Sequence, residues 1–359
     1  MTYLDYQATT PLAPEALAAM LPWLESQHAN PHSPHREGRR AKAAVEVARD
    51  QVAALLPPGG RVAFTSGATE ALNWAIKGTA GSITTLATEH AAVLDTAAVE
   101  AARGRAVATL PVGPDGLVDL DEARAAARPG LVATMLVNNE IGVIQPVAAL
   151  AEIAHAAGAL MLCDAVQGYG RVPGPETVDL IAISAHKIHG PKGIGALWIR
   201  DGVDLAPLLH GGGQEASGRS GTLSPALCAG FGAAAQLMAD RKDQDTAHID
   251  HLWSLALNRL GPGWTINGAT DSRYHGNLNI RREGLDVNRL MSDLRDIAFS
   301  AGSACASGSG RSSHVLRAIG LTEPQARSSI RLGFGRYTTQ TELGDAIDAI
   351  VAAAEGQWP

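Results

Sequence analysis

Lys187 stands at an unusual place for a lysine side chain. It lies just beyond a short apolar run, residues 180–183, which predicts a buried strand of a parallel sheet. Partial desolvation lowers the pKa of an amine and frees its lone pair, and a lysine that forms a Schiff base needs this property. Most lysines are only solvated charges, so this position alone leaves both interpretations open. Lys192, in the Gly-Pro-Lys-Gly turn that follows, is predicted to be an ordinary surface charge.

Further polar side chains follow the ends of other predicted strands. Apolar runs at residues 61–65, 82–87, 131–137 and 159–163 alternate with helical patterns, as in a parallel doubly wound sheet. Ligands of such sheets bind outside the carboxyl ends of the strands. A polar side chain after one strand would be ordinary. Five strands that bring polar side chains to the same edge of the sheet predict a site. Its candidate residues are Thr69, His90, Asn139, Asp164, Gln167, Ser184, His186 and Lys187.

The stretch after the first of these strands has the pattern of an anion-binding turn. Residues 66–69 are small or hydroxylic, and they lead into a predicted helix at residues 71–76. Such a turn points free backbone N–H groups and a hydroxyl at an anion. The spacing differs from that of a P-loop, so an ordinary strand-to-helix turn remains an open alternative.

Together these residues suggest pyridoxal phosphate chemistry, which requires four things of a protein. A lysine forms a Schiff base, a carboxylate keeps the pyridine nitrogen protonated, donors hold the phosphate, and a side chain stacks on the ring. The chain offers Lys187 for the Schiff base, Asp164 for the nitrogen, Thr69, Ser184 and His186 for the phosphate, and His90 for the ring. The predicted cofactor is therefore pyridoxal 5'-phosphate.

Nine blocks of sequence between residue 3 and about residue 338 carry a resemblance to a known family. They are YLDYQATTP from residue 3, NPHSPH from 30, FTSGATE from 64, TEHAAVLDT from 88, NNEIGV from 138, SAHKIHGPKGIGAL from 184, RSGT from 219, SACAS from 303 and SIRLGFGR from 329. On these blocks the chain resembles the cysteine desulfurases of the NifS/IscS type, in the class V aminotransferase family. The resemblance implies an α/β fold of fold type I, with a large domain built on a mostly parallel doubly wound sheet, a smaller α+β domain, and a homodimer.

The resemblance also implies roles for individual residues. Lys187 and Asp164 keep the roles given above, His90 would also carry protons, and Gln167 would hydrogen-bond the ring oxygen. The remaining cofactor contacts would come from Ala68, Thr69, Asn139, Ser184, His186 and Thr222, the last reaching over from the partner subunit. Asn139 and Arg331 would hold the substrate carboxylate, because a guanidinium can form a bidentate pair with a carboxylate.

Cys305 matches the family's nucleophile, and its surroundings support this role independently. Residues 300–313 are almost all small and show no apolar periodicity, whereas a structural cysteine normally stands among Val, Leu and Ile, as Cys163 does. Cys163 and Cys228 are predicted to be core residues. A thiol of ordinary pKa is mostly protonated at neutral pH, so a base or a positive charge must assist Cys305, and His90 is the candidate.

The implied reaction removes sulfur from L-cysteine and gives L-alanine and a persulfide on Cys305. The sulfur would pass to an acceptor protein, in iron–sulfur cluster assembly or in another branch of sulfur metabolism. A selenocysteine lyase and an aminotransferase of the same fold are alternatives, although Cys305 in a loop of small residues argues against a simple aminotransferase. A non-catalytic sulfur carrier or scaffold is a further alternative, which the presence of Lys187, Asp164, His90 and Cys305 together disfavours.

The composition of the chain excludes several classes of function. The chain has 359 residues, of which 46% are apolar and 18% charged, and its net charge is −7, so neither nucleic-acid binding nor anionic-membrane binding is predicted. Three scattered cysteines predict neither a disulfide framework nor a metal site. No apolar run reaches about 18 residues and the first residues lack a signal-peptide pattern, so a cytoplasmic protein is expected.

The predicted domain boundary lies near residue 245, where the composition changes. Residues 12–245 would form the large cofactor-binding domain, and residues 1–11 and 246–359 the small domain with the Cys305 loop. Two features depart from the family's pattern: Ala185 replaces an expected glycine beside the phosphate site, and the chain stops at Pro359, earlier than IscS-type enzymes do. Because the longer tail helps those enzymes to dock an iron–sulfur scaffold, docking of such a scaffold remains open here.

Overall fold

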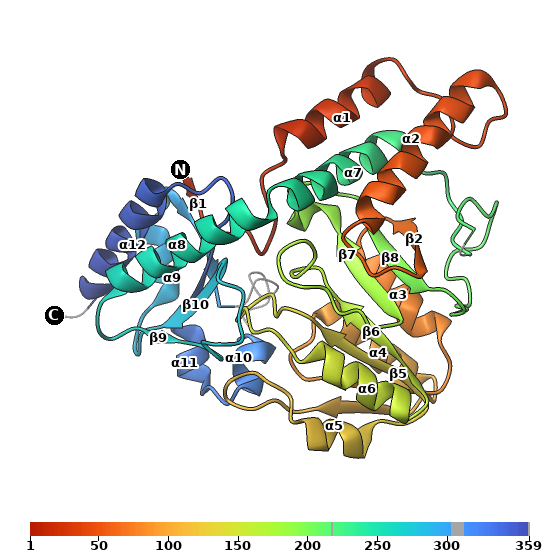
Figure 1. Cartoon of the computed structure of the whole chain (residues 1–359). Coiled ribbons are helices and arrows are strands. Elements are labelled where there is room, and N and C mark those ends of the chain that lie inside the picture. Colours follow the sequence, from red (N-terminus) through yellow and green to blue (C-terminus); the bar gives the residue numbers. More distant parts are fainter. Residues whose placement is uncertain (217, 303–311, 358–359) are drawn as a thin grey trace.

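The computed structural model describes residues 1–216, 218–302 and 312–357, and a seven-stranded sheet organises the larger part of them (Figure 1). The strands lie side by side in the order β2-β8-β7-β6-β5-β3-β4. Their bounds are β2 (Gly60–Thr65), β3 (Ser82–Leu86), β4 (Val107–Leu110), β5 (Gly130–Met135), β6 (Ala159–Asp164), β7 (Leu180–Ser184) and β8 (Gly195–Arg200).

Strand β8 is the exception to the parallel direction of this sheet. It is antiparallel to both of its neighbours, β2 and β7, whereas all other neighbouring pairs are parallel. The connection from β7 to β8, residues 185–194, contains only a short 3-10 turn, and a parallel pair would need a longer crossover. The predicted mostly parallel doubly wound sheet is confirmed, with β8 reversed.

Helices cover both faces of this sheet. Successive strand residues point to opposite faces, so Val62 and Phe64 of β2 pack in one hydrophobic core and Ala63 packs in another. The core of Ala63 includes residues of α3 (Ala68–Gly78) and α4 (Ala91–Ala102). The opposite core includes residues of α1 (Pro14–Glu25), α2 (Arg36–Ala53), α5 (Leu120–Ala126), α6 (Val147–Ala156) and α7 (Pro225–Asp240).

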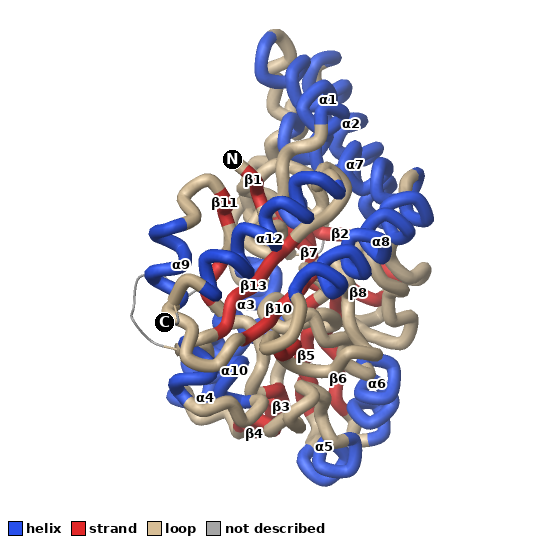
Figure 2. The backbone as a smooth tube through the Cα atoms, turned by 90° about the vertical axis from the view of Figure 1, so that its left-hand side faces the viewer, coloured by secondary structure: helices blue, strands red, loops and turns tan. Residues whose placement is uncertain are grey.

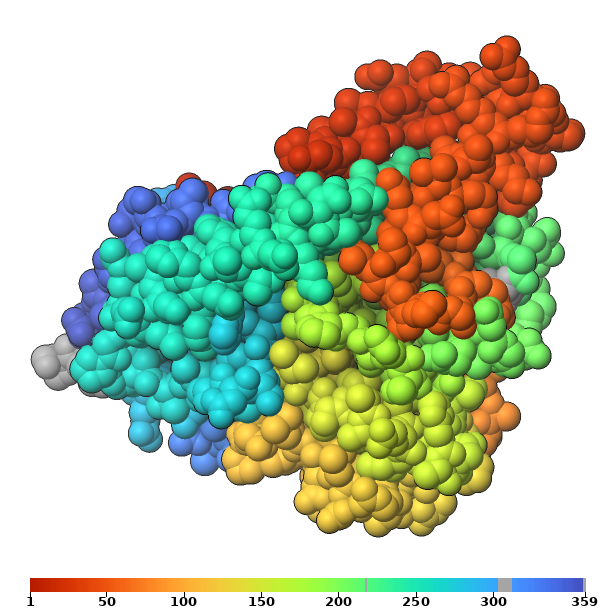
Figure 3. Space-filling model, in the orientation of Figure 1, coloured from red at the N-terminus to blue at the C-terminus, as the bar shows by residue number. Residues whose placement is uncertain are grey.

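Helices α1 and α2 project from the body of the molecule beside α7 (Figures 2 and 3). Small residues of α7 allow this close packing. A Cβ atom on Gly230 would lie 2.7 Å from Cγ of Met20 in α1, and a Cβ atom on Gly232 would lie 2.7 Å from Cα of Ala48 in α2. Glycine at both positions therefore lets α7 support the two projecting helices.

A third core, separate from the two on the seven-stranded sheet, lies in the C-terminal part of the chain and includes Leu4 from the N-terminus. Its sheet has the strand order β12-β13-β10-β9. The elements are α8 (Lys242–Leu260), β9 (Thr265–Ile266), β10 (Asn277–Arg281), α9 (Val287–Asp293), β12 (Ser300–Ala301), β13 (Ser329–Gly333) and α12 (Gln340–Glu355), with β1 (Thr2–Tyr3) paired to β11 (Ile297–Ala298). Helices α10 (His314–Ala318) and α11 (Glu323–Arg327) belong to a smaller cluster.

Helix α8 contributes to two of the three large cores. Ile249 packs in one core of the seven-stranded sheet, whereas Leu252, Ala256 and Leu260 pack in the third core. The boundary expected near residue 245 falls in the first turns of this helix, and the division into two domains stays a prediction. Among the described residues, no helix combines the length and the apolar character that a membrane span requires.

Candidate active site

A cavity of about 610 Å³ lies at the carboxyl ends of the parallel strands, and we name it the Lys187 cavity. Its volume is typical of sites for small ligands. The predicted site residues that line it are Ala68, Thr69, His90, Asn139, Asp164, Gln167, Ser184, His186 and Lys187. Residues 7–9 line it as well, and sequence analysis did not predict their contribution.

Lys187 ends the 3-10 turn (Ala185–Lys187) that directly follows β7. Its Nζ donates hydrogen bonds to the backbone carbonyls of Gln7 and, at 2.7 Å, of Ala8. Burial, together with the positive charges of Arg331 and Arg171, lowers the pKa of this amine to about 8. An amine with this pKa is partly neutral near physiological pH, so Lys187 can act as a nucleophile or a base.

The turn after β2 has the geometry of an anion site. Helix α3 begins at Ala68, two residues after the strand ends, and its N-cap residue, Gly67, has no side chain to bind the first N–H groups. A Cβ atom on Gly195 would lie 2.8 Å from Cα of Gly67, so β8 can pass this turn closely only because residue 195 is glycine. The first N–H groups of α3 therefore remain available to an anion in the cavity.

His186 and Lys192 add two basic side chains to the same cavity. Burial, together with the charges of Lys187 and Lys192, lowers the pKa of His186 to about 4, so its ring is neutral near pH 7. The ring Nδ1 lies 3.2 Å from Oγ1 of Thr9. Lys192 is exposed, as predicted, but it also lines the cavity, so it is more than a remote surface charge.

Asp164 and His90 lie close enough to influence each other's protonation. Asp164 ends β6, is 6% exposed, and accepts a hydrogen bond from the N–H of Val166 at 3.0 Å. Burial raises the pKa of its carboxyl, and the nearby His90 and Lys187 oppose this rise. Burial also lowers the pKa of His90, which favours a neutral ring.

The position of His90 at the start of α4 determines which ring nitrogen carries the proton. Its Nδ1 accepts a hydrogen bond from the N–H of Ala92 at 3.0 Å. In the neutral ring the proton is then on Nε2, which is a donor. His90 can therefore stabilise an anion by donating a hydrogen bond. To accept a proton on Nδ1, as the base role expected for it requires, His90 has to break its hydrogen bond with the N–H of Ala92.

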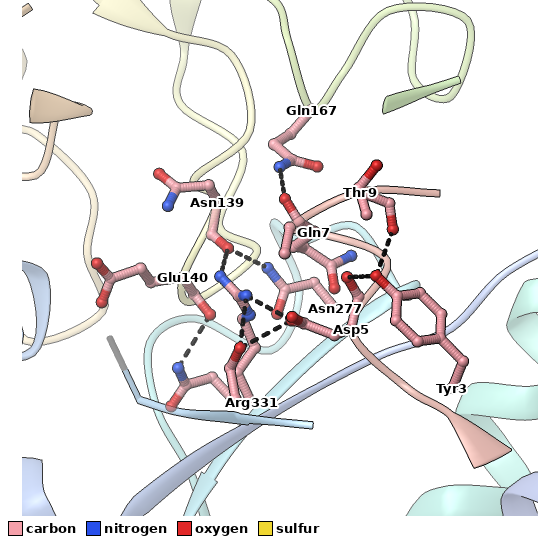
Figure 4. A network of polar contacts seen from close by, with 12 residues as sticks. Tyr3, Asp5, Gln7, Thr9, Asn139, Glu140, Gln167, Asn277 and Arg331 are labelled. Carbon is pink, nitrogen blue, oxygen red and sulfur yellow. Dashed lines mark hydrogen bonds and ion pairs between the residues drawn. The ribbon is translucent and has the colours of Figure 1, made fainter. Parts of the chain in front are cut away.

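The N-terminal segment lies across the Lys187 cavity and joins its walls. The carbonyl of Gln7 accepts a hydrogen bond from Nε2 of Gln167 at 2.9 Å, in addition to the one from Lys187 (Figure 4). Oγ1 of Thr10 donates to the carbonyl of His186 at 2.9 Å. These contacts fix the backbone around Lys187.

Arg331 lies in a polar network beside the cavity and does not line it. Its side chain is fully buried, and its Nη2 lies 2.7 Å from Oδ1 of Asp5 and 3.1 Å from Oγ of Ser300 (Figure 4). Its Nη1 donates to the carbonyl of Asn139 at 2.9 Å. Asp5 thus binds one nitrogen of the Arg331 guanidinium, which was predicted to hold the substrate carboxylate. The substrate-binding role of Arg331 stays a prediction.

The remaining predicted residues lie elsewhere. Thr222 is exposed and does not line the Lys187 cavity of its own chain, where no contact was predicted for it. Cys305 lies outside the described residues. Cys163 and Cys228 are fully buried, and burial raises the pKa of both thiols, so their predicted place in the core is confirmed.

A second cavity, of about 270 Å³, is lined by Arg171 and Arg336, and we name it the Arg336 cavity. Its lining includes Tyr6, Arg171, Asp245, Asp250, Tyr274, His275 and Arg336. Nη2 of Arg336 lies 2.6 Å from Oδ2 of Asp245, and Nδ1 of His275 lies 2.7 Å from Oδ1 of Asp250. Arg336 and His275 are therefore each paired with a carboxylate that lines the same cavity.

Comparison with known proteins agrees with this fold. The family model "Aminotransferase class-V" matches residues 2–345. Cysteine desulfurase IscS of Rickettsia akari (strain Hartford) is 42% identical over 367 aligned positions, which cover 97% of this chain and 90% of that protein. The solved NifS-like protein from Rickettsia africae ESF-5 is 30% identical, with a TM-score of 0.90 and 99% of both chains covered. The structure of SspA in complex with cysteine is 32% identical, with a TM-score of 0.84, and covers 94% of this chain and all of that one.

The fold is that of the fold type I pyridoxal-phosphate enzymes, as predicted, and the Lys187 cavity lies at the carboxyl edge of its sheet. The chain belongs to the aminotransferase class-V family and, within it, to the cysteine desulfurases of the NifS/IscS type.

Proposed function

We propose that this chain is a pyridoxal-phosphate-dependent cysteine desulfurase that takes sulfur from L-cysteine. One observation carries the proposal: a lysine with a pKa of about 8, a buried carboxylate and an anion-binding turn meet in one cavity. The names of the relatives support the same activity, since one is a cysteine desulfurase and another was solved with cysteine.

The residues of the Lys187 cavity fit pyridoxal phosphate. The turn at residues 66–69, with Ser184 and His186, offers N–H and hydroxyl donors for the phosphate, and Lys187 offers a partly neutral amine. Asp164 offers a carboxylate for the pyridine nitrogen, and a proton shared between the two groups would offset the cost of burying that carboxylate. When bound, the cofactor would draw electrons from Cα of the substrate.

Lys187 has two tasks in this account. It holds the cofactor until the amine of cysteine replaces it. Its neutral Nζ then takes the proton from Cα, and the low pKa of Lys187 makes this proton transfer possible near pH 7. The carbonyls of Gln7 and Ala8 accept hydrogen bonds from Nζ and so keep the amine inside the cavity.

Arg331 and Asn139 bind the carboxylate of cysteine in this proposal. The guanidinium of Arg331 is paired with Asp5, so the substrate carboxylate has to replace or share that partner. Asn139 lines the cavity, and its carbonyl already binds Arg331 at 2.9 Å, which ties the two residues together.

Cys305 receives the sulfur. Its thiolate attacks Sγ of the substrate, a sulfur–sulfur bond forms, and the bond between Cβ and Sγ breaks. The electron pair of that bond stays on Cβ, which takes up a proton. Lys187 then returns its proton to Cα, and the substrate leaves as alanine. Cys305 is left as a persulfide, and His90 can stabilise the attacking thiolate through its Nε2–H.

The protein acts as a homodimer in this proposal, with Thr222 of the partner subunit completing the phosphate site. An apolar stripe on α1, formed by Leu17, Leu21 and Leu24, is 40% to 63% exposed, which supports an interface with another chain. A sulfur-acceptor protein takes the persulfide sulfur, and the place of action is the cytoplasm.

The test is an assay of alanine and sulfide released from L-cysteine in the presence of a thiol reductant, with L-selenocysteine in parallel. The Cys305→Ser variant should keep the yellow absorption of the bound cofactor and lose at least about 10²-fold in sulfide release. Cys228→Ala, which changes a buried cysteine, is the control and should keep the activity. Undiminished turnover of cysteine in Cys305→Ser would remove Cys305 from its role, and turnover of selenocysteine alone would favour a lyase.

A further inference from the structure

We propose that Arg171 is a positioning residue, which fixes the side-chain amide of Gln167 and the backbone of Lys187 from outside the Lys187 cavity. The inference rests on the proposed function, because Gln167 and Lys187 are the expected partners of the cofactor. Arg171 does not line the Lys187 cavity but lines the Arg336 cavity behind it, so it acts through the other two residues.

The turn after β6 places Arg171 beside Gln167. The N–H of Tyr169 donates to the carbonyl of Ala165 at 2.7 Å, and the N–H of Val172 donates to the carbonyl of Gly168 at 3.0 Å. Each of these hydrogen bonds joins residues four apart, and Gly170 between them has a φ of 70°, so the segment is a tight turn. Nη1 of Arg171 donates to Oε1 of Gln167 at 3.1 Å.

This contact determines which end of the Gln167 amide faces the cavity. A guanidinium can only donate, so the atom bound to Arg171 is the amide oxygen. Nε2 of Gln167 donates one of its two N–H groups to the carbonyl of Gln7 (Figure 4). Gln167 lines the Lys187 cavity, and the second N–H of its amide would suit an anionic ring oxygen there. Without Arg171, the amide loses the charged partner that selects this orientation.

Arg171 also binds the backbone at the lysine itself. Its Nη2 donates to the carbonyl of Lys187, which ends the 3-10 turn. The last carbonyls of a helical turn lack partners within the turn, so this hydrogen bond satisfies a group that would otherwise be free to move. The guanidinium is held in turn by the ring of Tyr274, whose centroid lies 5.3 Å away.

The positive charge of Arg171 affects Lys187 in addition to its hydrogen bonds. Among the described residues, no carboxylate forms an ion pair with Arg171, so its positive charge is felt at Lys187, where it lowers the pKa of the amine after burial and Arg331. A proton on the nitrogen of residue 187 is therefore less favourable with Arg171 present.

The test compares the cofactor-loaded wild type with Arg171→Gln, Arg171→Lys and a matched control, Arg200→Gln. Arg200 also donates to backbone carbonyls, those of Val178 and Glu176, but does not line the Lys187 cavity. The readout is the pH midpoint at which the visible absorption of the lysine-bound cofactor changes. Arg171→Gln should raise this midpoint by about one pH unit, because both a cation and an oriented donor are lost. Arg171→Lys should shift it by less than half as much, and Arg200→Gln should leave it unchanged.

A wild-type midpoint in both Arg171→Gln and Arg171→Lys would overturn the proposal and leave the proposed function intact. If Arg171→Gln does not fold, Arg171→Lys decides alone: an upward shift supports the role and no shift overturns it. If the wild type binds no cofactor, the proposed function fails instead. The midpoint of amine labelling at Lys187 in the cofactor-free protein then tests Arg171 by itself, and an unchanged midpoint in Arg171→Gln would contradict its role.

Discussion

Two cavities of this molecule, the Arg336 cavity and the Lys187 cavity, each contain a buried cation, and the two cations have different partners. In the Arg336 cavity, the guanidinium of Arg336 is 2.6 Å from a carboxylate oxygen of Asp245 and its side chain is 3% exposed. In the Lys187 cavity, the ammonium is bound by the carbonyls of Gln7 and Ala8, and no carboxylate of the described residues forms an ion pair with it. The guanidinium of Arg336 keeps its charge, whereas a buried lysine amine that is held by neutral groups can lose its proton.

This difference separates a structural site from a reactive one. Both cavities are lined by charged residues, so their composition alone does not distinguish them. The two cavities are distinguished by the type of the buried cation and by its partner. Lys187 has a pKa of about 8 because burial is not compensated by an ion pair, and three predictions test whether this contrast governs activity and stability.

The largest effect on activity is expected from a substitution of Asp164, whose carboxylate lines the Lys187 cavity. Asp164→Asn keeps the size of the side chain but removes the negative charge near His90 and Lys187. We expect a loss of about 10³-fold in kcat for sulfide release, because the substituted amide no longer stabilises a proton on the pyridine nitrogen. Steady-state kinetics at saturating cofactor measure it, and a loss below about threefold would contradict the role of Asp164.

A large effect on stability, without a matching effect on chemistry, is expected in the Arg336 cavity. Asp245→Asn leaves the buried guanidinium of Arg336 without its carboxylate, which should cost about 3–5 kcal/mol of unfolding free energy. Asp250→Asn is the control, because its pair with His275 is exposed and should contribute only about 0–1 kcal/mol. Urea unfolding measures both. A severe loss of kcat in folded Asp245→Asn would show that the two cavities are not distinct in function.

The smallest effect concerns the pH dependence of the cofactor-free protein. The amine of Lys187 loses its proton at about pH 8 when folded and near its ordinary value of 10.5 when unfolded, so the unfolded state binds more protons between these pH values. Stability should therefore rise with pH across this window, and Lys187→Met should lack the rise. Amine labelling followed by mass spectrometry should give a midpoint near pH 8 for Lys187. A midpoint near 10.5 would contradict the account.

The part of the site carried by the sheet could be predicted from the sequence. Asp164, Ser184 and Lys187 each come just after an apolar run, and strands of a parallel sheet bring such ends to one edge. The mostly parallel sheet followed from the alternation of strands and helices. Helix α4 was not predicted, although His90 caps its first turn and could have indicated its start.

The rest of the site depends on contacts between segments far apart in the chain. Gln7 and Lys187 are 180 residues apart, and Asp5 and Arg331 are 326 residues apart, so no local pattern predicts that they meet. The resemblance predicted that Arg331 binds the substrate carboxylate, and the pairing of Arg331 with Asp5 in the structure was not predicted. Arg171 was missed for the same reason, since its contact with Lys187 requires the folded turn after β6.

The central claim is that Lys187, the lysine held only by carbonyl groups, forms the bond to the cofactor. The chain provides its own control, because Lys192 lines the same cavity but is exposed. Borohydride reduction of the pyridoxal-phosphate-loaded protein, followed by proteolysis and mass spectrometry, locates the lysine that carries the cofactor. We predict that the label is on Lys187 and absent from Lys192. A label on Lys192, or on any other lysine in place of Lys187, would contradict the account.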